Sequence, residues 1–105
     1  MRDLSPILTD LHHEFSQALG GQLAALYLYG SQARGDAHST SDIDVLAVIS
    51  GPFDYGDLLA RTSQCVASIS LENDVVISRA FVSREQFEHG GSPFLRNVRQ
   101  EAVAI

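Results

Sequence analysis

The sequence contains no lysine, a single cysteine (Cys65) and no long apolar run. The absence of lysine excludes Schiff-base chemistry and lysine-dependent phosphate loops, so a phosphate must be met by arginine, backbone amides or a metal ion. One cysteine excludes an internal disulfide and a thiolate metal cage, and it is ordinary for a reducing cytosol. Because no segment reaches membrane-spanning length and the first residues lack a signal-peptide pattern, we expect a cytoplasmic protein without a membrane partner.

Positive charge is scarce as well. Thirteen Asp and Glu residues stand against seven Arg residues, which gives a formal net charge of −6. Such a balance repels phosphate backbones and excludes generic nucleic-acid binding. With 105 residues and 45% hydrophobic composition, we expect one domain over residues 1–105 with one compact core. A domain of this size has little surface left beyond one ligand site. We therefore expect a second substrate to be held by a partner protein.

Hydrophobic periodicity predicts helices and strands along the chain. Apolar residues at three- and four-residue steps indicate helices from Asp3 or Ser5 to Leu19 and over residues 55–71. Short apolar runs indicate strands at residues 23–29, 43–49 and 75–82, the second of them buried on both faces. A near-complete capping box at residues 83–86 and a Ser-Pro pair at residues 92–93 begin two further helical segments. We expect an α/β (α+β) fold in which helices cover a small mixed sheet.

Two aspartates, Asp42 and Asp44, stand at the mouth of the second predicted strand. The side-chain period of a strand projects both carboxylates to the same side. Two like charges so close repel each other unless a cation lies between them, and carboxylate oxygens suit a hard ion such as Mg²⁺. The pair therefore predicts a divalent-metal site; a solvated strand end or a capping turn is the alternative.

A glycine and a serine, Gly30 and Ser31, directly follow the first predicted strand. Glycine lets the backbone turn sharply, and exposed amides with a serine hydroxyl can hold an anion. Arg34 lies three residues further, and Gly35 lets the chain leave the turn. The segment predicts a phosphate-binding turn that faces the two aspartates. Ser31 as a plain turn residue and Arg34 as the ion-pair partner of Asp36 are the alternatives.

The letters GSQARG at residues 30–35, followed by SDID at residues 41–44, resemble the signature of the polymerase-beta-type nucleotidyltransferases. The resemblance implies the fold of that family, ATP as the nucleoside triphosphate and two Mg²⁺ ions. It also implies a third carboxylate at a neighbouring strand, for which Asp74 is the candidate and Glu72 the substitute; Asp74 as a strand cap is the alternative. The implied site residues are Gly30, Ser31, Arg34 and Ser41 for the nucleotide, and Asp42, Asp44 and Asp74 for the metal and catalysis.

The same resemblance implies a reaction and a partner. An acceptor hydroxyl attacks the α-phosphorus, the nucleoside monophosphate is transferred and pyrophosphate leaves. Larger relatives hold the acceptor with a further helical domain, whereas stand-alone members are often paired with a small helical toxin of the HEPN type that they adenylylate. We therefore expect a protein adenylyltransferase that serves as an antitoxin. The alternatives are a non-catalytic antitoxin of the same fold and a small-molecule transferase of the aminoglycoside-modifying type, and exposed sheet edges make a homodimer an option.

Other conspicuous residues receive no metal role. His12 and His13 lie on the first predicted helix, far in sequence from the motif, and His38 lies in the polar loop, where we expect it to be solvated. Cys65 is expected to pack as a small apolar residue in the second long helix. Tyr29, which alternates with leucines, is expected to pack on the sheet close enough to the predicted turn to touch a nucleotide.

Overall fold

The computed structural model describes residues 3–34 and 42–105 of the chain. The elements, in chain order, are α1 (Ser5–Leu19), the 3₁₀ turn η1 (Gly20–Gln22), β1 (Leu23–Tyr29), α2 (Ser31–Arg34), β2 (Ile43–Ile49), α3 (Tyr55–Asn73), β3 (Ile77–Ser83), α4 (Arg84–His89), α5 (Pro93–Glu101) and β4 (Val103–Ala104). Within those two ranges, no helix is both long enough and apolar enough to cross a membrane.

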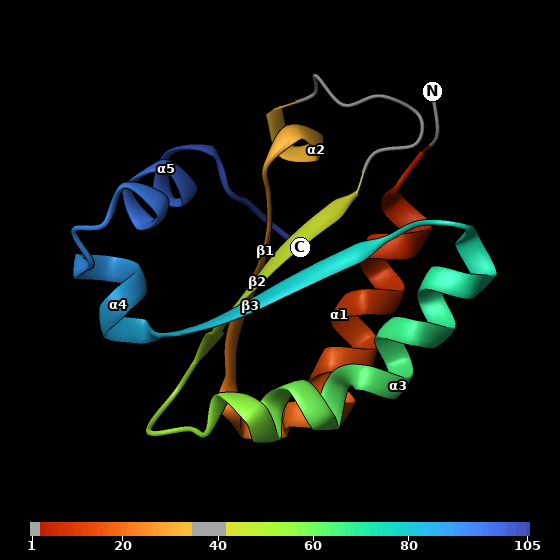
Figure 1. The fold of residues 1–105 in the computed structure, drawn as a ribbon, viewed down its shortest axis with the longest axis horizontal. Helices are drawn as coiled ribbons and strands as arrows, with labels where there is room; N and C mark the ends of the chain where they lie inside the picture. The colour runs from red at the N-terminus through yellow and green to blue at the C-terminus, as the bar shows by residue number, and fades with distance from the viewer. Residues whose placement is uncertain (1–2, 35–41) are drawn as a thin grey trace.

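The described strands form one mixed sheet in the order β3-β2-β1-β4 (Figure 1). β1 pairs antiparallel with both β2 and β4, whereas β2 and β3 run parallel and are connected by α3. All residues of β2 from 45 to 49 are buried, as expected for an inner strand covered on both faces. A mixed sheet covered by helices confirms the predicted fold class.

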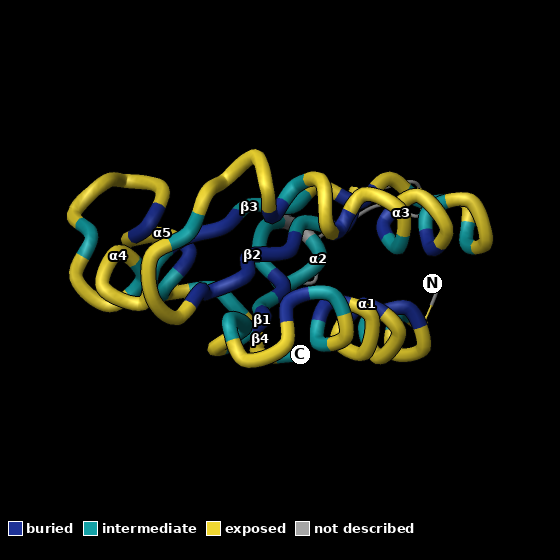
Figure 2. Tube along the Cα trace, turned by 90° about the horizontal axis from the view of Figure 1, so that it is seen from below, coloured by how far each residue is buried: buried dark blue, intermediate teal, exposed yellow. Residues whose placement is uncertain are grey.

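Helices cover both faces of the sheet. Figure 2 shows α1 and α3 on one side of the strands and α4 and α5 on the other. Side chains alternate between these faces along β2. Ile43 and Val45 belong to the core with α1 and α3, whereas Leu46 and Val48 belong to the core with α5. Asp44 therefore lies on the face that α4 and α5 cover.

The connection between α3 and β3 departs from the sequence prediction. α3 ends at Asn73, and Asp74 follows in the left-handed conformation with a φ of 53° while its N–H donates to the carbonyl of Ser70. The N–H of Val75 donates to the same carbonyl at 3.1 Å, so Val75 completes the helix cap. The strand begins at Ile77, two residues later than predicted. β4 was not predicted, because a two-residue strand carries no periodicity.

The two short helices after β3 begin as predicted. Around α4, the N–H of Gln86 donates to Ser83 Oγ at 3.0 Å, and the N–H of Ser83 donates to Gln86 Oε1 at 2.9 Å, which completes a capping box. At α5, Ser92 Oγ accepts from the N–H of Leu95 at 3.1 Å, and Pro93 occupies the first helical position. These caps fix the direction in which each helix leaves the preceding segment.

Candidate functional site

Asp42 and Asp44 lie at the start of β2. Asp42 is exposed directly before the strand, and Asp44, its second residue, is half-buried. Burial raises the pKa of the Asp44 carboxyl above its ordinary value, and the negative charge of Asp42 raises it further. The two carboxylates are therefore near enough to repel each other, and a cation bound between them would relieve that repulsion.

The turn at Gly30 lies directly against Asp44. Tyr29, the residue before the turn, pairs with Asp44 across the β1–β2 ladder. Gly30 has a φ of +76°, and a Cβ atom built on it would lie 2.6 Å from Asp44 Oδ2. Only glycine therefore allows both this backbone conformation and this approach. The structure brings the predicted turn and one predicted metal ligand face to face.

An aromatic side chain borders the same place. The ring of Tyr29 is half-buried on the face that α4 and α5 cover, and burial, followed by the negative charge of Asp44, raises the pKa of its hydroxyl. This ring meets Phe94 of α5 edge to face, with centroids 5.6 Å apart and planes at 85°. Tyr29 thus packs on the sheet as expected, and it also lies within electrostatic reach of the carboxylates.

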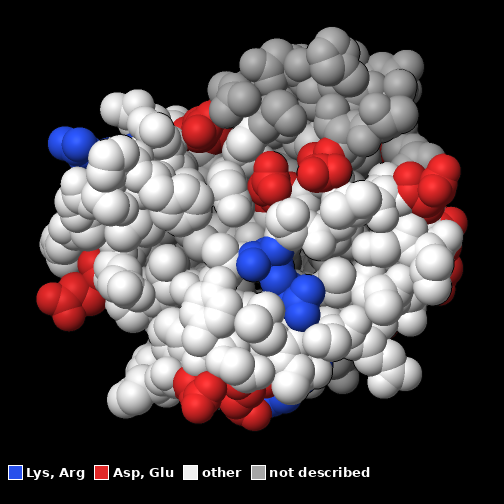
Figure 3. All heavy atoms as spheres, viewed as in Figure 1, with Lys and Arg blue, Asp and Glu red and all other residues white. Residues whose placement is uncertain are grey.

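The surface at this end of the sheet is acidic. In Figure 3, acidic side chains gather at the upper end of the molecule, beside the grey residues, where Figure 1 shows the start of β2 and the helix α2. A group of basic side chains lies just below them, near the middle of that view. An acidic surface attracts cations and repels free polyphosphate, so a phosphate ligand fits here together with a counter-cation.

The predicted third acid, Asp74, lies two residues before Val76, whose carbonyl accepts from the N–H of Ile43 at the start of β2 at 2.8 Å. It is exposed at the end of α3, four residues before Ser78, which is the β3 residue opposite Asp44. Ser78 and Ala80 share the sheet face of Asp44, and β3 contains no Asp or Glu. Among the described residues, no group of three or more His, Cys, Asp or Glu side chains could hold a metal ion. The role of Asp74 stays a prediction.

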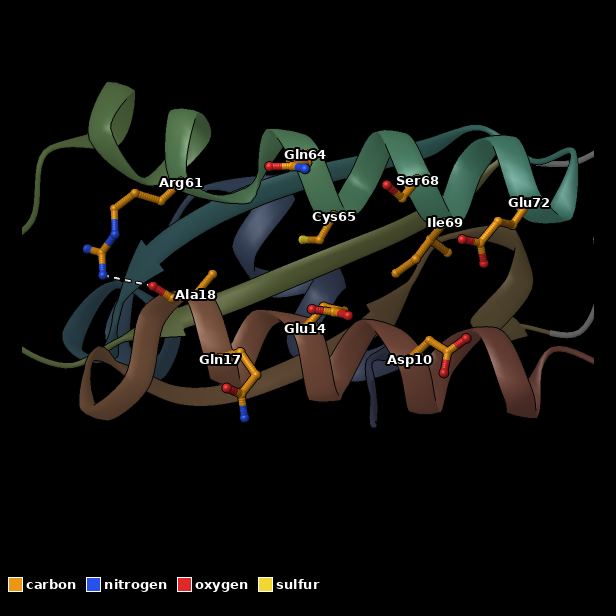
Figure 4. Close-up of a pocket in the computed structure, with 10 residues that line it drawn as sticks. All are labelled: Asp10, Glu14, Gln17, Ala18, Arg61, Gln64, Cys65, Ser68, Ile69 and Glu72. Carbon is orange, nitrogen blue, oxygen red and sulfur yellow. Dashed lines mark hydrogen bonds between the residues drawn. The ribbon is translucent and has the colours of Figure 1, made fainter.

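Glu72, the substitute for that acid, lines a groove of about 510 Å³ between α1 and α3. Figure 4 shows Asp10 and Glu14 of α1 across this groove from Cys65 and Glu72 of α3. The groove lies on the α1–α3 side of the sheet, whereas Asp44 faces the other side. Burial raises the pKa of the Cys65 thiol, and the charge of Glu14 raises it further. Cys65 therefore stays protonated at neutral pH and packs as a small apolar residue.

Several predicted phosphate-binding groups lie outside the described residues. Ser41 falls in the gap at residues 35–41, and the side chains of Ser31 and Arg34 are not described either; His38, which was expected to be solvated, falls in the same gap. The backbone of Ser31 and Arg34 forms the two ends of α2, a four-residue helix that directly follows Gly30. Contacts of these side chains with a phosphate stay predictions.

Two residues next to the site, Phe94 and Ser78, were not predicted from the sequence. Phe94 reaches Tyr29 because α5 packs over the sheet, and Ser78 faces Asp44 because β2 and β3 pair in parallel. Neither contact follows from spacing, since each joins segments far apart in the chain. The only available signals were the Ser-Pro cap before Phe94, which predicts a helix, and the third apolar strand, whose register was unknown.

The chain belongs to the nucleotidyltransferase domain family, whose model matches residues 8–103. A protein from Sulfolobus solfataricus assigned as a nucleotidyltransferase shares the fold at 20% identity and a TM-score of 0.64, covering 95% of this chain and 79% of that one. A toxin–antitoxin structure with AMP-PNP has 16% sequence identity and a TM-score of 0.61, and the match covers 91% of this chain and 69% of that one. A mutant of the toxin–antitoxin MntA-HpeT has 16% sequence identity and a TM-score of 0.60, and the match covers 100% of this chain and 72% of that one. No curated protein matches the chain.

Proposed function

We propose that this domain is a Mg²⁺-dependent nucleotidyltransferase that moves AMP from ATP to a hydroxyl group of a partner protein. The observation that carries the proposal is the approach of the Gly30 turn to Asp44, where a built Cβ would lie 2.6 Å from the carboxylate. Because turn and carboxylate adjoin, one ligand can touch both, with its phosphates on the backbone amides and its metal on the carboxylates. Membership of the family supports the class of reaction.

The residues present fit a hard divalent cation. Asp42 and Asp44 offer oxygen ligands only, and their mutual repulsion, with the raised pKa of Asp44, favours a cation beside them. Mg²⁺ takes one or two carboxylates from a protein and completes its coordination with water and substrate phosphates. When bound, the ion supplies positive charge that offsets the negative charge developing on the phosphates.

The remaining steps are assigned to residues of the chain. The backbone amides that follow Gly30, together with Ser31, Arg34 and Ser41, hold the β- and γ-phosphates. The acceptor oxygen bonds to the α-phosphorus, while the bond from that phosphorus to the oxygen bridging the β-phosphate breaks and pyrophosphate departs with the electron pair. The proton of the acceptor hydroxyl passes to a carboxylate, for which Asp74 is proposed. Holding the leaving group and the acceptor in line supplies most of the catalysis.

The proposed acceptor is a small helical toxin of the HEPN type, with this domain as its antitoxin. Solved structures that share the fold come from toxin–antitoxin systems, and this analogy supports the assignment at the level of the fold. The net charge of −6 disfavours nucleic acid as the acceptor. A protein acceptor agrees better with that charge.

Transfer of label from α-labelled ATP to the co-purified partner tests the proposal. We expect label on the partner with the unaltered chain and Mg²⁺, and initial rates about 100-fold lower with Asp42→Ala or Asp44→Ala, because charge stabilisation at the phosphates is lost. Asp10→Ala removes an exposed acid from the groove between α1 and α3 and is expected to retain the rate. Full label transfer by both site variants contradicts the proposal.

Asp74→Asn tests the third acid separately from the backbone turn. Asn adopts the left-handed conformation about as readily as Asp, so the fold and the affinity for ATP are expected to persist. The transfer rate is expected to fall about 100-fold, because the carboxylate that takes the acceptor proton is gone. Glu72→Gln is the matched control and is expected to transfer label normally. The reverse result, a normal rate for Asp74→Asn and a loss for Glu72→Gln, moves the third acid to Glu72.

One observation favours a second function, a nucleotide-binding antitoxin without turnover. Ser78 rather than an acid faces Asp44 on β3, and the described part of the chain contains no cluster of three possible metal ligands. Such a module would bind the partner and neutralise it by contact alone. Neutralisation that survives Asp44→Ala, in the absence of any label transfer, identifies this function. Neutralisation that is lost together with label transfer identifies the transferase.

A further inference from the structure

Phe94 presents an aromatic ring to solvent beside the candidate site. It lies in the first turn of α5 and is 44% exposed, whereas Leu95 and Val98 of the same helix are buried. A single exposed apolar side chain is ordinary by itself. This ring, however, continues an aromatic surface, because it meets Tyr29 edge to face with centroids 5.6 Å apart.

Tyr29 joins that surface to the carboxylates. It is the last residue of β1, it precedes Gly30, and it pairs with Asp44 across the ladder, so that both side chains lie on the same face of the sheet. Moving outward along that face from Asp44, one meets first the Tyr29 ring and then the Phe94 ring. A ligand whose phosphates lie at Asp44 would therefore extend its other end towards Phe94.

α5 holds Phe94 in place without depending on its ring. Ser92 caps the first turn, in which Pro93 fixes the backbone. At the other end of the helix, the guanidinium of Arg99 donates to the carbonyl of Phe87 at 2.8 Å and to that of Gly90 at 2.7 Å. The exposed ring is thus preorganised on an anchored helix, which lowers the cost of ordering it against a ligand.

We propose that Phe94, supported by Tyr29, is the stacking platform for the base of the nucleotide. This inference rests on the proposed function and adds the location of the base. An exposed aromatic ring matches the flat, apolar face of a base, and the edge-to-face neighbour fixes the orientation of the ring. Stacking accepts any base, because every base has such a face. The platform therefore supplies affinity for the nucleoside and no selection among bases.

Equilibrium binding of ATP and of inorganic tripolyphosphate, each with Mg²⁺, separates the base from the phosphates. Phe94→Ala is expected to weaken ATP binding about 10-fold, which corresponds to about 1.4 kcal/mol, and to leave tripolyphosphate binding unchanged. Phe94→Leu keeps apolar volume in the helix without an aromatic face, and it is expected to weaken ATP binding similarly. Phe94→Tyr keeps the aromatic face and is expected to bind both ligands normally.

Leu71→Ala is the control for the loss of an exposed apolar side chain, because Leu71 of α3 is 85% exposed and belongs to the other helix layer. It is expected to bind both ligands normally. ATP binding that is unchanged in Phe94→Ala overturns the platform and assigns the ring to another contact, such as a partner protein. Equal weakening of ATP and tripolyphosphate also overturns it, because the phosphate site is then disturbed. If the unaltered chain binds neither ligand, the proposed function itself fails.

Discussion

The two faces of the sheet are built for different tasks. Towards α1 and α3 lies a broad apolar core, in which Leu11 and Phe15 are fully buried. Towards α4 and α5 the core is smaller and is extended by two aromatic pairs that involve Tyr27 and Tyr29. Asp44 lies at the end of this second face. Most of the burial that stabilises the fold is therefore on one side, and the candidate site is on the other.

Polar groups differ between the faces in the same way. On the α1–α3 side, Thr62 is fully buried, donates to the carbonyl of Leu58 at 2.8 Å and accepts from Arg79 Nε at 2.8 Å. Asp44, on the other side, is half-buried beside a second carboxylate and has a raised pKa. A buried polar group with partners serves the fold, whereas a partly buried acid held next to a like charge indicates a ligand site.

Removing a large side chain from each core measures the difference between the faces. Phe15→Ala is expected to lower the free energy of unfolding by about 3–5 kcal/mol, because it removes a fully buried ring. Leu95→Ala, at the margin of the smaller core, is expected to cost about 2 kcal/mol, the lower end for such changes. Urea unfolding followed by circular dichroism gives both values. Equal losses would mean that the two faces share the stability evenly.

Gly30→Ala is expected to act mainly on ligand binding. The new Cβ would collide with Asp44 Oδ2 and would occupy a positive-φ position that disfavours alanine. We expect the affinity for ATP with Mg²⁺ to fall about 100-fold, or about 2.7 kcal/mol, because either the turn or the carboxylate must move. Calorimetric titration measures this change.

Gly51→Ala is the matched control for that substitution. Gly51 has a φ of +79°, and nothing lies within 4 Å of a Cβ built on it. The backbone strain is therefore comparable, about 1–2 kcal/mol of unfolding free energy, but no site residue is touched. Normal ATP affinity is expected. If Gly30→Ala and Gly51→Ala lose ATP affinity equally, the loss results from general backbone strain and not from the contact of residue 30 with Asp44.

Much of the fold could be predicted because its signals are local. The strands at residues 23–29 and 43–49 have the predicted bounds, since each is a short apolar run between polar or glycine residues. The capping box at Ser83 has the same local origin. The start of β3 was misplaced because Asp74 adopts the left-handed conformation and Val75 joins the helix cap, which depends on the hydrogen bonds at the end of α3.

In the candidate site too, the features that depend on neighbouring residues could be predicted, and those that depend on strand pairing could not. The nearness of Asp42 to Asp44 follows from strand period, and the turn at Gly30 follows from a glycine after a strand. That this turn faces Asp44 was also predicted; the particular pairing that brings it there, Tyr29 opposite Asp44, was not, because the spacing alone does not fix the register of β1 with β2. The identity of the β3 residue opposite Asp44 was harder to predict, because it depends on the register of two parallel strands that α3 connects. Features set by neighbouring residues could thus be predicted from the sequence, whereas features set by the register of distant strands required the structure.

Alkylation of Cys65 tests how closed the α1–α3 side is. Burial and then the charge of Glu14 raise the pKa of this thiol, so at pH 8 less of it is thiolate than in the unfolded chain. We expect iodoacetamide to react more slowly with the folded chain than with the chain in urea. Glu14→Gln is expected to speed the reaction slightly, whereas Gln17→Ala, in the same groove, is expected not to alter it. A folded chain that reacts as fast as the unfolded one would show that the groove between α1 and α3 gives the reagent free access to this thiol, and its burial would then not protect it.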